Sequence, residues 1–279
     1  MSQVSGAREP PVAESAVRWS GTNALALLLG LAVGVGVLML RLPTVSQKAS
    51  YHEFADQRSW LGIPNFLNVA SNLPFVLLGI AGMAFTWRAG TGDGHFVDRR
   101  ESWAYFGLFV GVFLTGFGSA YYHWSPDNGR LVWDRLPMTI AFASLIAALI
   151  AERISARWGL RLLPFLMLYA AGTVFLWYRG EAQGHGDLRL YAGVQAYSAL
   201  ALLAAAVLPS PYSERKDFAI AFGCYLVAKI FENADHSIFR LHHLVSGHTL
   251  KHLASALAAY CLWRMLRIRR RYRLAAVTG

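Results

Sequence analysis

Two histidines near the end of the chain have a spacing typical of a metal site. His248 and His252 are four residues apart, so on a helix their imidazoles project from one face, one turn apart. One helix offers two ligands to a zinc ion with this spacing. Water or lipid headgroups can satisfy a histidine pair at a membrane surface equally well. The pair alone therefore leaves both interpretations open.

A second motif lies at the end of an apolar run far upstream. Ser119 and His123 have the same spacing of four, and Asp134 follows near the start of the next apolar run. Each residue also has an ordinary interpretation: the serine can bond to its own helix backbone, the histidine can cap the helix, and Arg135 can pair with Asp134. An ionisable group within a membrane segment is costly, however, and by default indicates a functional site.

Together the five side chains match a catalytic zinc site better than any of them does alone. His123, His248 and His252 would supply three ligands and leave a fourth position for water, whose pKa zinc lowers to about 7. The carboxylate of Asp134 can then accept a proton, and the hydroxyl of Ser119 can donate to a developing oxyanion. The set predicts metal-assisted hydrolysis.

The composition places these residues in a membrane. The chain has 279 residues, of which 55% are hydrophobic and 15% are charged, against about 25% charged in soluble domains. Uncharged apolar runs of roughly 20 residues are long enough to cross a bilayer. The net charge of +10 is concentrated in arginines after the last apolar run, which leaves no basic domain for nucleic acid. We predict an all-α, polytopic membrane helix bundle.

The apolar pattern predicts eight spanning helices and a disordered tail over residues 1–18. The helices are expected at about 20–41, 65–87, 102–123, 131–151, 160–178, 189–208, 215–234 and 248–266, with a loop over 236–247. The first run exceeds the usual length of a signal peptide, so we expect a retained helix. Lys229, Glu232 and Asp235 form one helical stripe. It is read as a structural ion pair or, alternatively, as a support in which Asp235 accepts from a ligand imidazole.

The distribution of Lys and Arg predicts the orientation. The arginine cluster after the last helix favours a cytoplasmic C-terminus, and eight spans then place the N-terminus on the same side. His123, Asp134, His248 and His252 all fall near the opposite, non-cytoplasmic face. Gly79 and Gly82 in the second predicted helix indicate close helix packing.

These motifs resemble those of a known family. The pattern S-x3-H-x10-D followed by Leu136-Pro137-Met138, the paired histidines that open the last helix, and Asn68-x-x-Ser71-Asn72 on an early helix resemble the alkaline ceramidases. That family belongs to a wider superfamily of seven-helix membrane hydrolases that includes adiponectin-receptor-like proteins. The resemblance covers about residues 50–268. It implies a tail and an added helix over 1–45, a seven-helix catalytic domain over 46–270 and a basic cytoplasmic tail over 271–279.

The resemblance also implies roles for the five residues. His123, His248 and His252 would bind Zn²⁺. Asp134 would deprotonate the zinc-bound water and later protonate the leaving amine, and Ser119 would stabilise the oxyanion. The substrate would be a ceramide-like N-acyl lipid within the bilayer, cut into a fatty acid and a long-chain amine.

The chain departs from the family at a calcium site. Animal alkaline ceramidases have acidic residues before the first core helix and a glutamate at its start. Here Asn65 stands at the helix start, and Glu53 and Asp56 are the acidic residues upstream. This departure argues against calcium dependence, and Asp56 and Asn65 are read as remnants of that site or as part of a seal over the outer face.

Two other functions compete with hydrolysis. A receptor-like or lipid-binding seven-helix membrane protein would use the same bundle with a structural zinc, and it would keep its fold and ligand binding after Asp134→Asn. A transporter ranks last, because the sequence has no pair of broken helices in matching halves. The sequence does not predict an oligomeric state.

Overall fold

The computed structural model describes residues 21–92 and 94–272, and over these ranges it is helical with no β-strand. The helices are α1 (Gly21–Arg41), the 3-10 helix η1 (Ala49–His52), α2 (Phe66–Ala70), α3 (Leu73–Thr91), α4 (Glu101–Trp124), α5 (Asn128–Arg153), α6 (Ala156–Ala182), α7 (Arg189–Val207), α8 (Lys216–Asn233), α9 (Asp235–His242) and α10 (Gly247–Ile268). The expected all-α fold is confirmed. The tail over 1–18 and most of the basic tail, 273–279, lie outside the described residues.

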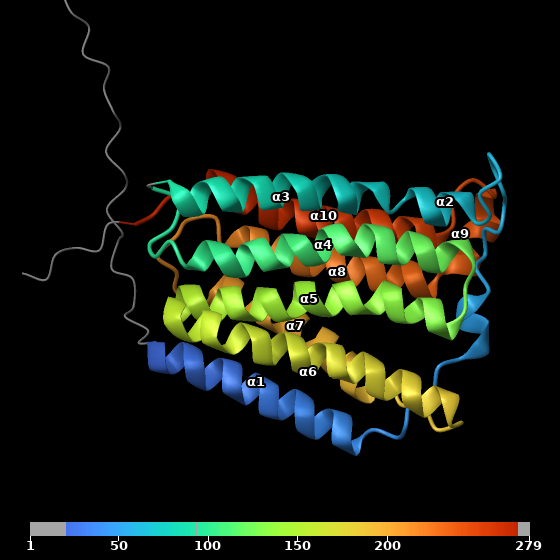
Figure 1. Cartoon of the computed structure of the whole chain (residues 1–279), viewed down its shortest axis with the longest axis horizontal. Helices are drawn as coiled ribbons and strands as arrows, with labels where there is room; N and C mark the ends of the chain where they lie inside the picture. Colours follow the sequence, from blue (N-terminus) through green and yellow to red (C-terminus); the bar gives the residue numbers. More distant parts are fainter. Residues whose placement is uncertain (1–20, 93, 273–279) are drawn as a thin grey trace, which may run out of the picture.

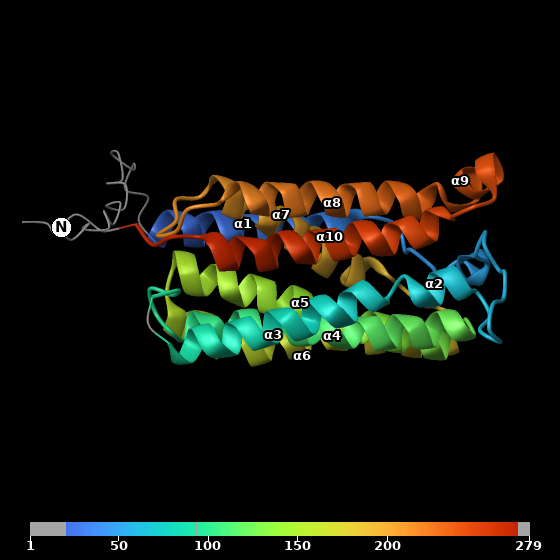
Figure 2. The ribbon, with the colours of Figure 1, turned by 90° about the horizontal axis from the view of Figure 1, so that it is seen from above.

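The long helices run side by side along one axis (Figure 1). Seen from above, α8 and α10 lie in one layer and α3, α4 and α6 in another (Figure 2). The start of α1 and the end of α10 lie at the same end of the bundle (Figure 1). The end of α4 and the starts of α5 and α10 lie at the other end, which brings the sequence motifs together there.

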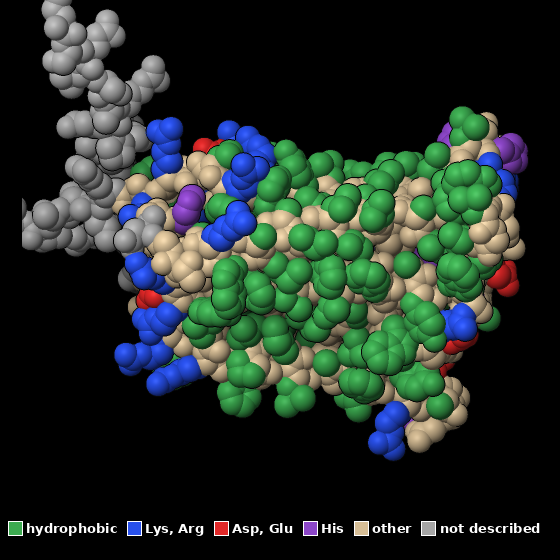
Figure 3. Space-filling model, turned by 45° about the horizontal axis from the view of Figure 1, so that its top comes forward, with side chains coloured by type: hydrophobic (Ala, Val, Ile, Leu, Met, Phe, Trp, Pro, Cys, Tyr) green, Lys and Arg blue, Asp and Glu red, His purple; other side chains and the backbone are tan. Residues whose placement is uncertain are grey.

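Within residues 21–92 and 94–272, six helical segments are long and apolar enough to cross a membrane: α1, the pair α2–α3, α4, α5, α6 and α7. The other two of the eight predicted spans form the helices α8 and α10, which are not among these six. The flank of the bundle is a broad apolar band, and many Lys and Arg side chains gather at the end where α10 finishes (Figure 3). A polytopic membrane bundle is therefore confirmed. Which end is cytoplasmic stays a prediction.

Helices α8 and α10 carry more charge than the other long helices but run alongside them (Figure 2). Several of their charged side chains are paired within the protein. Arg264 on α10 bonds both carboxylate oxygens of Asp217 on α8, at 2.9 and 2.8 Å. Lys251 on α10 lies 3.2 Å from Glu232 on α8. Pairing of this kind lets a charged helix lie inside a membrane protein.

The second predicted helix is interrupted between α2 and α3. Pro74 lies in the first turn of α3, where it has no N–H to continue the ladder from α2. Asn68, Ser71 and Asn72 are all buried at the interruption. The hydroxyl of Ser71 and the amide of Asn72 both donate to the carbonyl of Asn68, at 3.2 and 2.8 Å. Most of these polar groups therefore find partners inside the protein, as the sequence requires; the exception is Oδ1 of Asn72, which has no hydrogen-bond partner among the described residues.

A short helix, α9, occupies part of the predicted loop over 236–247, so that prediction is wrong for residues 236–242. The helix has eight residues, many of them polar, and no apolar run reveals it. Lys229 and Glu232 on α8 form the expected ion pair, at 2.7 Å. Asp235 begins α9 instead of continuing their stripe.

Small residues bring α3, α4 and α5 into close contact, as predicted for Gly79 and Gly82. A Cβ atom at Gly79 would lie 2.6 Å from Cα of Phe113 on α4, and one at Gly82 would overlap the ring of Phe109. On the other side of α4, a Cβ atom at Gly118 would overlap the carbonyl of Trp133 on α5. Ser119 follows Gly118 directly, and His123 lies one helical turn after Ser119. The close packing at Gly118 therefore sets the position of both residues along α5.

Candidate metal centre

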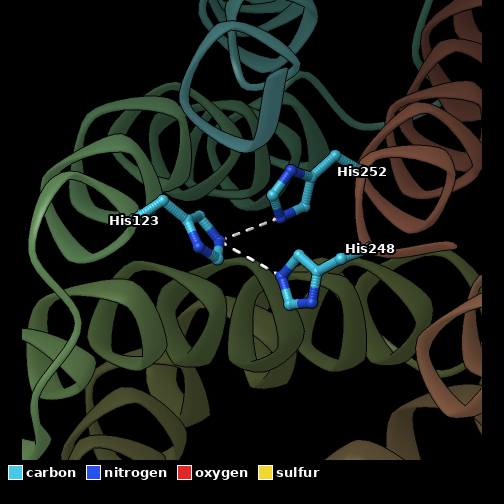
Figure 4. Close-up of side chains that lie close together, drawn as sticks. All are labelled: His123, His248 and His252. Carbon is cyan, nitrogen blue, oxygen red and sulfur yellow. Dashed lines mark hydrogen bonds between the residues drawn. The ribbon is translucent and has the colours of Figure 1, made fainter. Parts of the chain in front are cut away.

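Three imidazoles face one another (Figure 4). They lie where α4 ends and α10 begins, at the end of the bundle away from the arginine cluster (Figure 1). His123 comes from the last turn of α4, and His248 and His252 come from the first two turns of α10. The Nε2 atom of His123 lies 3.2 Å from Nε2 of His252 and 3.3 Å from Nε2 of His248. All three side chains are buried, with exposed fractions of 1%, 4% and 4%.

The spacing of these nitrogens fits a single metal ion. Two histidines bound tetrahedrally at about 2.0–2.1 Å from zinc have ligand nitrogens roughly 3.3–3.4 Å apart. Neutral imidazoles satisfy such an arrangement only in part, because a single N–H on His123 can donate well to only one of the other two rings. The Nδ1 atom of His123 is also buried without a hydrogen-bond partner. A cation at the centre would satisfy all three lone pairs. Imidazole ligands suit zinc, copper, iron and nickel, so the donors fit a transition metal without fixing which one.

Ser71 orients one of the imidazoles. Its hydroxyl oxygen lies 2.7 Å from Nδ1 of His252, and the same hydroxyl donates to the carbonyl of Asn68. The hydroxyl therefore accepts from the Nδ1–H of His252, which leaves Nε2 unprotonated and facing the other rings. A hydrogen bond to the ring nitrogen that faces away from a metal fixes the tautomer and orientation of a metal-binding histidine. The sequence placed Ser71 inside the protein but did not identify His252 as its partner.

Asp235 fixes the start of α10. Its Oδ1 atom accepts from the backbone N–H of His248 at 2.7 Å, and Oδ2 accepts from the backbone N–H of Ala55 at 3.0 Å. The alternative prediction, in which Asp235 accepts from a ligand imidazole, is wrong. Its carboxylate instead positions the backbone that carries His248. A Cβ atom at Gly247 would lie 2.7 Å from Cα of Asp235, so the close approach needs glycine there.

Ser119 and Asp134 lie beside the histidines. Both are buried, and the two side chains lie close together, Ser119 on α4 and Asp134 on α5. Both line the same cavity as His248 and His252. Asp134 is not one of the three clustered ligands. The structure therefore brings all five predicted residues to one end of the bundle, with the serine–carboxyl pair next to the histidine cluster.

Arg135 does not pair with Asp134, which removes the structural interpretation of that carboxylate. Its Nη2 atom donates to the side-chain oxygen of Gln47 at 2.6 Å. Its guanidinium lies over the ring of Trp177, with 4.1 Å from Cζ to the ring centre. The side chains of Asp134 and Arg135 thus diverge from neighbouring positions on α5.

The cavity beside the histidines has a volume of about 990 Å³. Ser119, Asp134, His248 and His252 form part of its polar end, and the remaining wall includes many apolar side chains of α4, α5, α7, α8 and α10. Its lining on α10 continues to Leu262, about 21 Å along the helix from His248. The cavity therefore joins the polar centre to the apolar middle of the bundle.

Asp56 and Asn65, the two positions compared with a calcium site, form hydrogen bonds in the segment between η1 and α2. Both carboxylate oxygens of Asp56 accept from Arg58, each at 2.8 Å. Burial raises the pKa of Asp56, but the hydrogen bonds and charge of Arg58 outweigh it and lower the pKa below its ordinary value. The Asn65 amide donates to the carbonyl of His123 at 2.9 Å.

The chain matches no protein-family model and no curated protein. The fold and the site define it as a helical membrane protein with a buried cluster of three histidines that could hold a metal ion.

Proposed function

We propose that the protein is a zinc-dependent intramembrane hydrolase. It would cleave the amide bond of ceramide-like N-acyl lipids to a fatty acid and a long-chain amine, as the resemblance to the alkaline ceramidases implies. One observation carries the proposal: three Nε2 atoms converge beside a serine–carboxyl pair at the polar end of a largely apolar cavity.

The number of ligands favours catalysis over a structural role for the metal. Among the residues that the structure describes, the cluster contains three histidines and no fourth protein ligand. Structural zinc sites are typically closed by four protein ligands, whereas catalytic sites keep one position open. When bound there, zinc would supply a Lewis acid and lower the pKa of a water molecule to about 7.

The remaining steps fall to Asp134 and Ser119. The carboxylate of Asp134 would take a proton from the attacking water and return it to the nitrogen of the leaving amine as the C–N bond breaks. The hydroxyl of Ser119 would turn from Asp134 to donate a hydrogen bond to the developing oxyanion of the carbonyl oxygen. The water oxygen would remain on the acyl product as the fatty acid.

The cavity supports a lipid substrate. Its volume falls within the range of about 300–1,000 Å³ usual for ligand pockets. Apolar residues of the wall, such as Leu145, Leu202 and Leu262, would accommodate an acyl chain, and the polar end would then hold the amide. A substrate that stays in the bilayer would reach this cavity without crossing water.

The test measures zinc content and fatty-acid release from a panel of ceramides. It compares detergent-purified wild type with Asp134→Asn and with the control Asp98→Asn, whose carboxylate pairs with Arg100 on the surface. We expect about one zinc per chain in all three proteins and release by the wild type and the control. In Asp134→Asn release should fall by about 10²–10⁴-fold, the usual contribution of an acid–base group.

Two outcomes would contradict the proposal. Absence of zinc would remove the metal site. Zinc in all three proteins without release from any ceramide would favour the receptor-like alternative, in which zinc is structural and the cavity binds a lipid without cleaving it.

A further inference from the structure

Arg135 on α5 is a buried cation without a carboxylate partner. Its exposed fraction is 5%. Its Nη2 atom donates to Gln47, whereas the buried Nη1 atom has no hydrogen-bond partner. Three rings surround the guanidinium, with Cζ 4.1 Å from the ring centre of Trp177, 5.1 Å from Tyr191 and 5.8 Å from Tyr51.

The rings alone do not account for this side chain. An aromatic face stabilises a cation above it, but it does not accept hydrogen bonds from the edge of the guanidinium. Buried charges are normally paired. The bundle follows this rule elsewhere, because Arg153 and Arg269, the other buried arginines in the described ranges, both bond to Glu152. Arg135 is therefore an exception within the same protein.

This unpaired arginine lies at the wall of the cavity. Arg135 lines the same cavity as its neighbour Asp134. Lys229 and Lys251 also line it, but they share the carboxylate of Glu232, at 2.7 and 3.2 Å. Each of these two lysines thus has a carboxylate partner within the wall, although they share a single negative charge. Among the described residues, no carboxylate bonds to Arg135, which feels the neighbouring Asp134 only through space. Its Nη1 atom keeps a free N–H donor at the cavity.

We propose that Arg135 binds an anionic oxygen, of a carboxylate or a phosphate, on the molecule that occupies the cavity. Such oxygens are the acceptors that a guanidinium bonds most strongly. Gln47 and the three rings hold the guanidinium in place before the ligand arrives. If the occupant of the cavity is the substrate, this inference rests on the proposed function. The substrate would then be an N-acyl lipid that carries a negative charge near its amide.

The test compares twelve-carbon probes that have no amide and therefore cannot report hydrolysis. Dodecyl phosphate and dodecanoate carry the two candidate anions, and dodecanol is the neutral reference. The dissociation constant of each is measured by calorimetric titration of the full-length protein in a neutral detergent. The variants are Arg135→Gln and the control Arg130→Gln, which removes the same charge from α5 outside the cavity lining.

We expect the wild type and Arg130→Gln to bind at least one anionic probe about tenfold or more tightly than dodecanol, as a charged hydrogen bond implies. In Arg135→Gln this preference should disappear, apart from any part due to the metal. Whichever probe is preferred, the phosphate or the carboxylate, identifies the chemistry of the anion. No preference in the wild type, or an equal preference in Arg135→Gln, would overturn the inference.

A second variant covers the case in which Arg135→Gln does not fold. Arg135→Lys keeps the charge but loses the planar fork, so the preference for the anion should fall several-fold. An unchanged preference would contradict a role for the guanidinium. The two proposals fail separately: hydrolysis of neutral ceramides without an anion preference refutes only this inference, and an anion preference without hydrolysis refutes only the proposed function.

Discussion

Two buried polar clusters lie at opposite ends of the same bundle and are built on different principles. At the arginine-rich end, Glu152 accepts from Arg269, from Arg153 at 3.3 Å and from the hydroxyl of Tyr105 at 2.7 Å. At the other end, three imidazoles face one another at 3.2 and 3.3 Å. We call these the ion cluster and the histidine cluster. Both are more than nine-tenths buried.

The difference lies in what completes each cluster. In the ion cluster, a carboxylate meets cations and a hydroxyl, so each charge offsets the cost of burying the other. In the histidine cluster, three ring nitrogens face one another without a carboxylate, and a cation at the centre would satisfy all three lone pairs. The first arrangement ties α4, α5 and the end of α10 together. The second could hold a metal ion, and a large cavity lies beside it.

The largest effect is expected from removing a histidine. In His123→Ala two ligands remain, so zinc content should fall from about one per chain to near zero, together with the hydrolysis that we propose. Metal analysis of the purified protein checks this. The unfolding temperature should match that of chelator-treated wild type, because both have lost the same bound ion. Retained zinc in His123→Ala would place the metal elsewhere.

Removing an arginine from the ion cluster should affect stability instead. Arg269→Met leaves the Glu152 carboxylate buried with fewer donors, which should cost about 3–5 kcal/mol. Unfolding in mixed micelles checks the loss, and metal analysis should still find zinc in the folded fraction. Arg267→Met, at an exposed position two residues earlier, is the matched control and should change little. Loss of zinc in folded Arg269→Met would show that the two clusters are coupled.

The sequence was most informative about which residues share one face of a helix, because local periodicity determines this. Spacings of four placed Ser119 with His123 and His248 with His252 on single helix faces, and the alternation of spans brought α4 and α10 to one end. The partners of these residues were less predictable. Ser71 lies 181 positions before His252. Asp235 begins α9, a helix that no apolar run reveals, and accepts from the backbone N–H of His248 after that helix ends. Such contacts depend on the packing of the helices, which periodicity does not specify.

Arg135 shows the same limit in another form. The sequence left open that Arg135 pairs with the adjacent Asp134. Neighbouring residues on a helix point about 100° apart, however, so their side chains need not meet. The guanidinium instead reaches Gln47 and the ring of Trp177 on α6. A charge pair that is adjacent in sequence is therefore weak evidence that the pair forms in a membrane bundle.

A smaller effect is expected from the residue that supports a ligand. Ser71→Ala removes the hydroxyl that accepts from Nδ1 of His252, so the affinity for zinc should fall by about 10–100-fold without loss of the fold. Competition with a fluorescent zinc chelator measures it. Thr91→Ala, at an exposed hydroxyl at the far end of α3, should leave the affinity unchanged. An unchanged affinity in Ser71→Ala would mean that packing alone orients His252.

The smallest effect is expected from Asp56 and Arg58, an ion pair at the histidine end that resembles the ion cluster in chemistry but not in burial. Arg58 is 53% exposed and also donates to the carbonyls of His243 and Leu244, at 2.9 and 2.7 Å. Because the pKa of Asp56 is lowered in the folded protein, its stabilising effect is present above the unfolded value of about 3.9 and is lost as the pH falls through the folded value.

Solvent screens this pair, so Asp56→Asn should lower the unfolding temperature at pH 7 by at most about 3 °C. The difference from the wild type should vanish at the lowest pH at which both still fold. A loss of stability as large as that of Arg269→Met would show that charge pairing, and not burial, determines how much each ion pair stabilises the fold.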